Sequence, residues 1–260
     1  MRNVTLILLA VLLSSCATHQ PMRAWNASTT IIPPNSMMTF LDRENGKLSA
    51  VYTEDIIRIL DIKARIEEVA GVMHTDLLIA EGEQPNGYSF VTKQGPRIAV
   101  NFGMMQMLTQ DDDAMAALIG HELAHLYLEH GRLRQEREAN RITTSVVLTF
   151  ALGMFGIPMP VDVADAATSA VTRSYSRDDE RAADQLGVEY MVKAGFDPFG
   201  SVHLQEKLGA AAKGTSLSFL STHPSNKERV ENMKHLAQEY QQKAAPSTEA
   251  TDTRQSPPAP

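Results

Sequence analysis

The chain has 260 residues, of which 43% are hydrophobic and 21% are charged, and its formal net charge is −7. This is the composition of a globular protein with a sizeable core, and it excludes global disorder. An acidic chain also presents no basic field to a phosphate backbone, so nucleic acid is excluded as the main partner.

The amino terminus has the pattern of a lipoprotein signal. Arg2 supplies a positive charge, and the apolar run Val4–Leu13 is too short to span a bilayer permanently. Leu13-Ser14-Ser15-Cys16 resembles the bacterial lipobox, which implies cleavage before Cys16 and acylation of its thiol. Ala17 follows, and the resemblance then favours an outer-membrane anchor that faces the periplasm. The alternative is a plain secretory signal with a chance cysteine.

Cys16 is the only cysteine in the chain. A disulfide within the fold is therefore excluded, and no thiol is left for catalysis once Cys16 is acylated. This cysteine usage suits an exported protein that is indifferent to redox conditions.

Four regions are predicted along the chain. Residues 1–15 form the signal peptide, and residues 16–50 form the lipid anchor and a tether without periodic structure, which contains Pro33-Pro34. Residues 51–243 form one folded domain, and residues 244–260 form a proline-rich, polar and disordered tail.

The folded domain is predicted to be α+β and mainly helical. Apolar residues at helical spacing predict a helix over Glu54–Val69, with Gly71 placed to end it. Short runs between turn signals predict the strands of a small, largely antiparallel sheet, and these runs are Leu77–Ala80, Tyr88–Thr92 and Arg97–Asn101. The methionines at positions 104, 105 and 107 are expected to fill the core.

Four more helices are predicted in the rest of the domain. Thr109 is expected to cap a helix that has three aspartates in its first turn and runs to Gly131. The other three are predicted over Asp178–Lys193, Pro198–Ala212 and Pro224–Lys243. The apolar run Val146–Ile157 is too short for an ordinary transmembrane helix and is expected to be buried or to act as a lid.

The run His121-Glu122-Leu123-Ala124-His125 lies well inside the first of these four helices. Side chains four residues apart project from one face, so His121 and His125 can bind one zinc ion together. Glu122 can reach the water-bearing coordination position, where zinc lowers the pKa of the water and the carboxylate accepts its proton. The alternative is a helix with surface histidines and a solvated glutamate, and the capped helical context disfavours it.

A catalytic zinc of this type needs a third protein ligand. His130 is not at position 131, where a metzincin has its third histidine, and is expected to lie at a helix carboxyl end. Glu180 and Asp184 share one helix face, so Glu180 can bind zinc while Asp184 hydrogen-bonds a liganding histidine. An ordinary acidic first turn explains both residues equally well on spacing alone. Chemistry leaves further glutamates open as ligands, namely Glu136, Glu138 and Glu189.

Three motifs in this order resemble family forty-eight of the metallopeptidases, the HtpX-like and CAAX-prenyl-protease group. They are His121-Glu122-Leu123-Ala124-His125, Asp179-Glu180-Arg181-Ala182-Ala183-Asp184 and Ser221-Thr222-His223-Pro224. The resemblance covers about Glu54–Tyr240 and points to the exported lipoprotein branch of the family. It implies a zincin-like domain with one Zn²⁺ per chain, and it favours Glu180 as the third ligand.

The resemblance also places His223 near the active site. There it is expected to stabilise the oxyanion of the tetrahedral intermediate, or to occupy a zinc position in a resting, self-inhibited state, and the sequence leaves both open. A histidine that only caps and packs before Pro224 is the structural alternative. The resemblance further implies that an edge strand at Gly87–Val91 holds the substrate as an added strand, and the alternative there is a hairpin of the core sheet.

Together these features predict a zinc-dependent endopeptidase. Glu122 is expected to take the proton of the attacking water and to deliver it to the departing amine. The resemblance implies misfolded or unassembled envelope proteins as substrates, and hence envelope quality control. One alternative is a metal-containing chaperone or binding lipoprotein that holds envelope clients with little proteolysis. The other is a structural zinc module in which His223 is a permanent fourth ligand.

Overall fold

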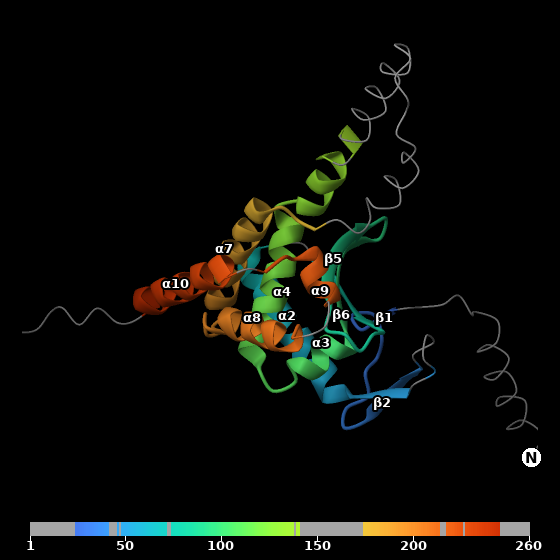
Figure 1. Ribbon diagram of the computed structural model, residues 1–260. Coiled ribbons are helices and arrows are strands. Elements are labelled where there is room, and N and C mark those ends of the chain that lie inside the picture. Colours follow the sequence, from blue (N-terminus) through green and yellow to red (C-terminus); the bar gives the residue numbers. More distant parts are fainter. Residues whose placement is uncertain are drawn as a thin grey trace, which may run out of the picture.

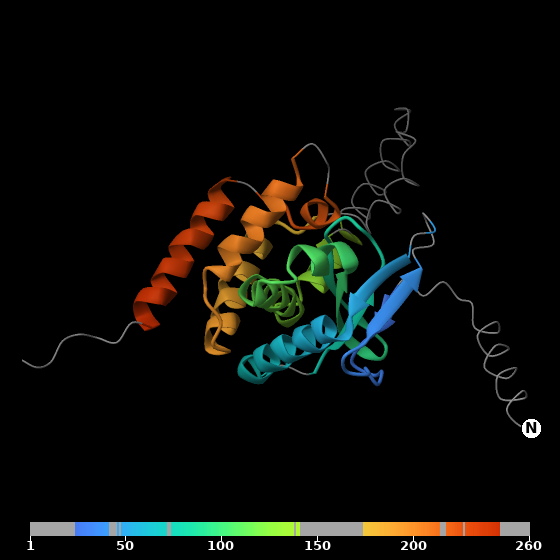
Figure 2. The same ribbon diagram turned by 90° about the horizontal axis from the view of Figure 1, so that it is seen from below.

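The computed structural model describes residues 24–41, 46, 48–71, 74–137, 139–140, 174–213, 217–225 and 227–244. Helix α4 (Asp112–Tyr127) lies at the centre, with helices on one side and a sheet on the other (Figure 1). Figure 2 looks nearly along α4 and shows the helices around it, which are α2 (Thr53–Ala70), α7 (Arg177–Lys193) and α8 (Gly200–Ala211). The predicted α+β, mainly helical fold is confirmed.

The sheet beside α4 has four strands in the order β1-β4-β6-β5. Their bounds are Ala24–Asn26 for β1, Asp76–Ala80 for β4, Gly87–Thr92 for β5 and Gly95–Asn101 for β6. β1 pairs antiparallel with β4 and β5 pairs antiparallel with β6, whereas β4 and β6 are parallel. The predicted small sheet is therefore mixed, because the chain passes from β4 to the outer strand β5 before it returns as β6. Among the described strands, only β6 pairs with β5, so β5 is an edge strand.

The main core lies between this sheet and the helices. Its strand residues are almost completely buried, and they include Leu77, Ile79, Ile98 and Val100. Met104 and Met105 follow in a short helix that was not predicted, α3 (Phe102–Met107), and both are buried in the same core, as expected. Met107 is partly buried and packs against it.

Helix α2 matches the predicted helix closely. It ends at Gly71, whose φ of 61° is the left-handed conformation that glycine adopts at helix carboxyl ends. Its inner face is apolar and buried, and it consists of Ile56, Ile59, Ile62 and Ile66. Glu67 joins the end of this helix to the start of β4, since its carboxylate accepts hydrogen bonds from the backbone and the hydroxyl of Thr75.

The start of α4 differs from the prediction by two residues. Asp111 caps the helix, since its carboxylate accepts the N–H of Ala114 at 3.0 Å. Thr109, the predicted cap, instead contacts Asp55 of α2 through its hydroxyl at 3.2 Å. Both residues lie in the turn after α3, and only Asp111 is at the correct position to reach the first free N–H groups.

The end of α4 also differs from the prediction. The helix ends at Tyr127 rather than at Gly131, because Glu129 adopts a left-handed φ of 54° that interrupts it. Residues 130–137 then form a second helical segment, so Gly131 lies inside a helix. A glutamate is an unusual residue for this conformation, which explains why the sequence pattern favoured the glycine.

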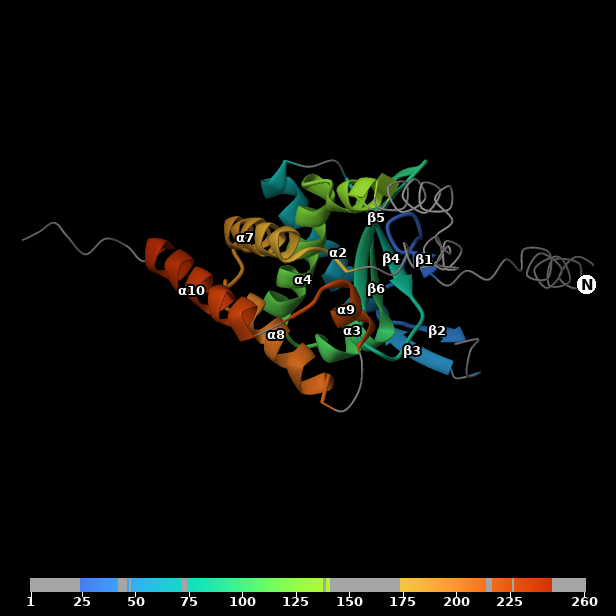
Figure 3. The same ribbon diagram turned by 45° about the horizontal axis from the view of Figure 1, so that its top comes forward.

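The region predicted to be a tether, residues 16–50, contains three strands in its described part. β1 adds to the main sheet, with Trp25 opposite Ile79. β2 (Met37–Leu41) and β3 (Leu48–Tyr52) form a separate antiparallel hairpin, which Figure 3 shows apart from the main sheet. This corrects the prediction of an aperiodic tether. The strands are too short to show a period, and the partner of β1 lies about fifty residues later in the chain.

The three predicted carboxyl-terminal helices are present as α7, α8 and α10 (Lys227–Ala244). A short helix that was not predicted, α9 (Ser218–Thr222), lies beside the sheet in Figures 1 and 3. The apolar run at 146–157 lies outside the described residues. None of the described helices combines the length and the apolar character needed to cross a membrane.

Candidate metal centre

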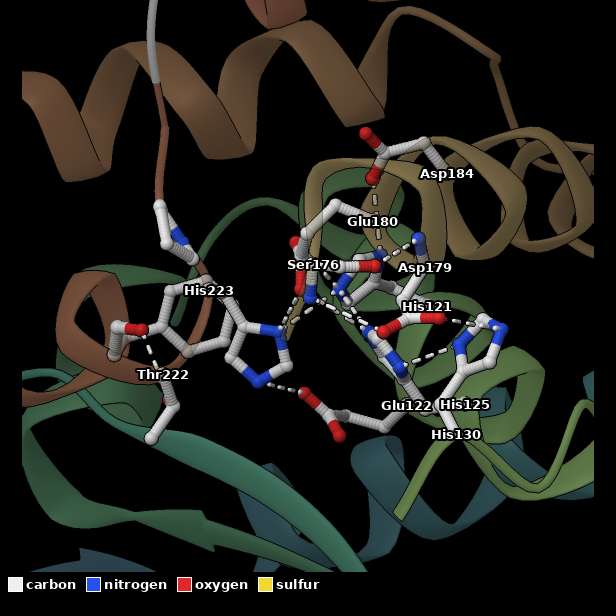
Figure 4. A network of polar contacts seen from close by, with 12 residues as sticks. His121, Glu122, His125, His130, Ser176, Asp179, Glu180, Asp184, Thr222 and His223 are labelled. Carbon is white, nitrogen blue, oxygen red and sulfur yellow. Dashed lines mark hydrogen bonds and ion pairs between the residues drawn. The ribbon is translucent and has the colours of Figure 1, made fainter. Parts of the chain in front are cut away.

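Donor atoms from α4, from α7 and from the residue that follows α9 converge next to the sheet. They belong to His121, His125, Glu180 and His223, all of which are buried. One donor atom from each side chain lies within 4.8 Å of all the others. Figure 4 shows these four side chains pointing toward one another. We call this set the donor group.

Helix α4 supplies two members of the donor group from one face. His121 and His125 are one turn apart, and their Nε2 atoms lie 3.0 Å from each other. Their ring planes are nearly perpendicular, with centroids 4.6 Å apart. Because α4 is buried over this whole stretch, both imidazoles are shielded from bulk water.

Helix α7 brings Glu180 to these histidines. The helix begins with a capping box, in which the Ser176 hydroxyl accepts the N–H of Asp179 and the Asp179 carboxylate accepts the N–H of Ser176, both at 3.1 Å. This fixes the first turn. Glu180 Oε1 then lies 3.5 Å from His125 Nε2, and Glu180 Oε2 lies 3.6 Å from His121 Nε2.

His223 enters the donor group from the end of α9. Its N–H donates to the carbonyl of Phe219 at 2.8 Å, and its ring stacks on the Phe219 ring. His223 Nδ1 lies 3.0 Å from Glu180 Oε1 and 3.2 Å from His121 Nε2. Its other nitrogen, Nε2, lies 3.4 Å from Glu122 Oε1. His223 therefore connects the donor group to Glu122.

Glu122 is completely buried next to the donor group. Within the described part of the chain, neither of its carboxylate oxygens has a well-aligned hydrogen-bond donor, and the contact with His223 is long. Burying a carboxylate without hydrogen bonds is costly, so such groups in folded proteins usually serve a ligand or a reaction. Glu122 has the surroundings expected of a residue that meets a small polar molecule.

A second layer of charges holds the donor group. Asp184 Oδ1 lies 3.0 Å from His121 Nδ1. Arg229 of α10 grips Asp184 with two hydrogen bonds of 2.7 Å, and its third nitrogen lies 2.5 Å from Glu180 Oε2. Such bidentate pairs fix geometry as well as charge. Arg229 is itself buried, so it orients both carboxylates of α7.

His130 supports His125 from the side away from the donor group. The Nδ1 atoms of the two rings lie 2.9 Å apart, and His130 Nε2 lies 3.9 Å from Asp179. Asp179 is paired in turn with Arg137 at 2.5 Å. The prediction that His130 lies at a helix carboxyl end is wrong. It begins the segment after the left-handed Glu129, and this break turns its ring toward His125.

Tyr175 covers His125. The two rings stack with centroids 3.9 Å apart, and the N–H of Tyr175 donates to the carbonyl of Thr222 at 2.9 Å. Burial and the nearby charge of Glu122 raise the pKa of Tyr175 to about 12. The hydroxyl is protonated at neutral pH, as in any tyrosine, and the raised pKa extends this protonated range to strongly alkaline pH.

The protonation states of His125 and Glu180 suit metal binding, whereas His121 has to lose a proton to become a ligand. Burial and the charge of His121 lower the pKa of His125 to about 2, so this imidazole is neutral. Burial lowers the pKa of His121, but the hydrogen bond with Asp184 and the charge of Glu180 outweigh it and the pKa is raised. Burial raises the pKa of Glu180, but hydrogen bonds from His125 and His223 outweigh it, so the pKa is lowered and the group is a carboxylate.

The other glutamates considered as ligands do not join the donor group. Glu136 pairs with Arg132 at 2.5 Å, and Glu189 pairs with Lys193 at 2.6 Å, each within its own helix. Glu138 and Cys16 lie outside the described residues.

Sequence reasoning missed the supporting roles of Arg229, His130 and Tyr175. His130 was rejected as a metzincin-type ligand and assigned to a helix carboxyl end, although its position five residues after His125 placed it near the site. Arg229 shows no local signal, because its partner Asp184 lies 45 residues earlier in the chain. Tyr175 lies directly before the cap of α7, and nothing in the pattern there indicated a ring contact.

The donor group fits a metal ion by its chemistry. Asp184 favours a hydrogen on Nδ1 of His121, which leaves the lone pair of Nε2 facing the group. The neutral His125 has its Nε2 at 3.0 Å from this lone pair, and the Glu180 carboxylate lies close to both. Acceptor atoms so close together repel unless hydrogens or a cation lie among them. Imidazole nitrogens and a carboxylate oxygen are ligands that divalent transition metals prefer.

A mainly helical fold with this donor group next to β5, an edge strand among the described strands, is typical of a metallopeptidase. Residues 53–237 match peptidase family M48, and the chain belongs to this family. The match begins at the first residue of α2 and ends within α10, so it contains the whole donor group.

Three relatives illustrate the range of the family around this chain. The chain is 26% identical over 208 residues to the mitochondrial metalloendopeptidase OMA1 of Schizosaccharomyces pombe, covering 74% of this chain and 56% of the relative. It is 26% identical over 137 residues to metalloprotease LoiP of Escherichia coli, covering 53% of this chain and 54% of the relative. It is 26% identical over 165 residues to a putative beta-barrel assembly-enhancing protease of Vibrio cholerae, covering 60% of this chain and 33% of the relative. The chain thus spans from a third to just over half of the length of these relatives.

Proposed function

We propose that this chain is a zinc-dependent endopeptidase that hydrolyses internal peptide bonds. His121, His125 and Glu180 hold one zinc ion, and Asp184 orients His121 as a ligand. The observation that carries the proposal is the convergence of these donors from α4 and α7 next to Glu122, whose buried carboxylate has no well-aligned donor among the described residues. Two histidines and one carboxylate are the ligand set of catalytic zinc sites that keep a position open.

When bound, zinc supplies Lewis-acid polarisation of a carbonyl and lowers the pKa of water. The chain contributes the proton transfers. Glu122 removes a proton from the attacking water and later delivers it to the departing amine nitrogen. Tyr175, whose ring stacks on His125 and whose hydroxyl is protonated at neutral pH, donates a hydrogen bond to the developing oxyanion in this proposal.

His223 occupies the fourth place of the donor group in a resting state. Its Nδ1 lies 3.2 Å from His121 Nε2, and its Nε2 reaches toward Glu122, so it stands where water and substrate would approach. Of the two roles that the sequence left open, these contacts favour self-inhibition. His223 follows the five-residue helix α9, which would have to shift with it to admit the substrate.

The substrate binds as an added strand on β5. This strand is an edge of the sheet in the described structure, and it packs beside α4, which supplies His121 and Glu122. Backbone pairing tolerates many side chains, which suits an enzyme that acts on unfolded segments. The position of β5 therefore supports the edge-strand reading over a hairpin buried in the core.

The substrates are misfolded or unassembled proteins of the bacterial envelope. The printed name of the Vibrio cholerae relative, a putative beta-barrel assembly-enhancing protease, supports this class. The lipobox-like run that ends at Cys16 supports a lipid anchor on the outer membrane facing the periplasm. The enzyme would then work in envelope quality control.

A metal-containing protein that holds clients with little proteolysis is the second candidate. It is favoured by one observation, the four-membered donor group, because a closed site with four protein ligands is structural rather than catalytic. A holding protein would bind unfolded envelope proteins and leave them intact.

The test is to purify the full chain in detergent and measure zinc content together with cleavage of unfolded casein. We expect about one zinc per chain, cleavage that a chelator abolishes, and recovery when zinc is added back. Glu180→Gln should lower the zinc content, whereas Glu136→Gln should not. Casein that stays intact while it binds a zinc-loaded chain would establish the holding protein instead.

A further inference from the structure

Strand β5 runs alongside α4 in the same direction. A Cβ atom built on Gly87 would lie 3.2 Å from Leu118, whereas Val91 shares a hollow with Leu126. The four residue steps from Gly87 to Val91 span about 13 Å, and the eight steps from Leu118 to Leu126 span about 12 Å. Matching positions along the two elements therefore stay side by side. Figure 1 shows them side by side.

This register places Ser89 level with Glu122. Ser89 is midway between Gly87 and Val91, and it lies on the same face of the strand, because alternate residues of a strand share a face. Glu122 is midway along α4 between the two leucines. A substrate paired with β5 therefore has its reacting bond near Ser89.

A hollow of about 310 Å³ lies next to Val91, two residues beyond Ser89 on the same face of β5. Its walls include Val91 and Pro96 of the hairpin and Leu123, Leu126 and Tyr127 of α4, and none of the described lining residues is charged. Val91 is 73% exposed and Tyr127 is 60% exposed in the described structure. Apolar side chains gathered around an open hollow mark a contact site.

We infer that this hollow is a specificity subsite for a large apolar side chain of the substrate that is not branched at Cβ, an inference that rests on the proposed function. A substrate residue directly opposite Val91 lies two positions from the residue opposite Ser89 and projects to the same face. That face is the one toward α4, so the side chain enters the hollow. A charged side chain would lose its hydration there without gaining a partner.

The pairing direction places this side chain on the amino-terminal side of the cleaved bond. An antiparallel strand is the slightly more stable partner per residue, and it runs from the Val91 end of β5 toward the Gly87 end. Its residues opposite Val91 thus precede those opposite Ser89. Leucine, methionine and phenylalanine have the reach to fill the hollow from the edge.

The test maps the cleavage sites of the zinc-loaded full chain on an unfolded protein by mass spectrometry. We expect leucine, methionine and phenylalanine to be enriched about tenfold at one position on the amino-terminal side. Val91→Glu should remove this enrichment and favour lysine and arginine instead. Tyr88→Glu, which puts the same charge on the opposite face of the strand, should leave the wild-type preference intact.

A binding measurement separates this inference from the proposed function. The Glu122→Gln protein should bind a leucine-containing peptide about tenfold more tightly than the matched glutamate peptide, and Val91→Glu should reverse the order. If peptides bind with this preference but nothing is cut, the endopeptidase proposal fails and the subsite stands. Cleavage without any preference, a preference unchanged by Val91→Glu, or a photo-crosslinker at Val91 that joins only the same chain or a second copy would overturn the subsite.

Discussion

Gly120 of α4 lies directly against Gly187 of α7. A Cβ atom on Gly120 would come within 2.7 Å of the Gly187 carbonyl oxygen, and one on Gly187 would come within 2.8 Å of the His121 backbone nitrogen. The two helices therefore touch backbone to backbone, one residue before His121 of the donor group. This close approach is what allows Glu180, two turns earlier on α7, to reach the histidines of α4.

Replacing Gly187 by alanine should loosen the donor group. The new methyl group has no space, so α7 must move away from α4, at a cost of about 1–3 kcal/mol in the free energy of unfolding. The shift should also lower zinc affinity, because Glu180 moves with its helix. Denaturant unfolding and zinc titration of the variant measure both effects.

Gly209→Ala is the matched control for this variant. Gly209 is an exposed residue of α8, and a Cβ atom there would meet nothing within 4 Å. We expect this substitution to stabilise the helix by roughly 0.5–1 kcal/mol and to leave zinc binding unchanged. Equal effects of the two substitutions would show that the contact between α4 and α7 is not tight.

Removing Arg229 should affect both the fold and the metal. In Arg229→Met the carboxylates of Asp184 and Glu180 stay buried without their partner, which costs about 3–5 kcal/mol of stability. Zinc affinity should fall by about 10–100-fold, because the residues that orient the ligands are disturbed. The control is Arg181→Met. It removes an exposed ion pair with Asp178 on the surface of α7 and should cost less than about 1 kcal/mol of stability. An Arg229→Met protein as stable as Arg181→Met would refute the positioning role.

Replacing His223 should raise activity. In His223→Ala the fourth place of the donor group is vacated while His121, His125 and Glu180 stay, so we expect faster casein cleavage at unchanged zinc content. Ser221→Ala, in the same segment, should behave as wild type. A fall in the cleavage rate at unchanged zinc content would instead indicate that His223 stabilises the oxyanion of the transition state.

Tyr190 should lose its hydroxyl proton at a higher pH than an ordinary tyrosine does. Burial and the neighbouring Tyr127 raise the pKa of Tyr190 to about 12. A raised pKa means that the folded protein holds this proton more tightly, so its contribution to stability is complete below about pH 10 and is lost as the pH rises through about 12. Absorbance titration should show a late step that Tyr190→Phe reduces. A variant with the wild-type titration curve would contradict the shift.

The parts of the fold that could be predicted from the sequence are those that depend on local residue patterns, such as helical periodicity. The buried isoleucines of α2 and the spacing of His121 and His125 follow from helical periodicity, and both are present. Contacts between distant segments had no such signal. The pairing of β1 with β4 and the grip of Arg229 on Asp184 join residues about fifty positions apart.

Turn chemistry explains the remaining differences. Glycine was expected at the end of α4, but the left-handed residue is Glu129, and this break is what directs His130 to His125. Only the family resemblance marked His223, since a histidine before a proline is otherwise an ordinary packing residue. The donor group was therefore predictable in its α4 members and dependent on the resemblance for Glu180 and His223.

In the proposed function, Glu122 transfers the proton in peptide hydrolysis. The most direct measurement compares casein cleavage by wild type and Glu122→Gln at equal zinc content, with the exposed Glu136→Gln as the control. Loss of general acid–base catalysis should lower the rate by at least about 100-fold in Glu122→Gln alone. Cleavage by Glu122→Gln at the wild-type rate, with zinc bound in both proteins, would contradict the account.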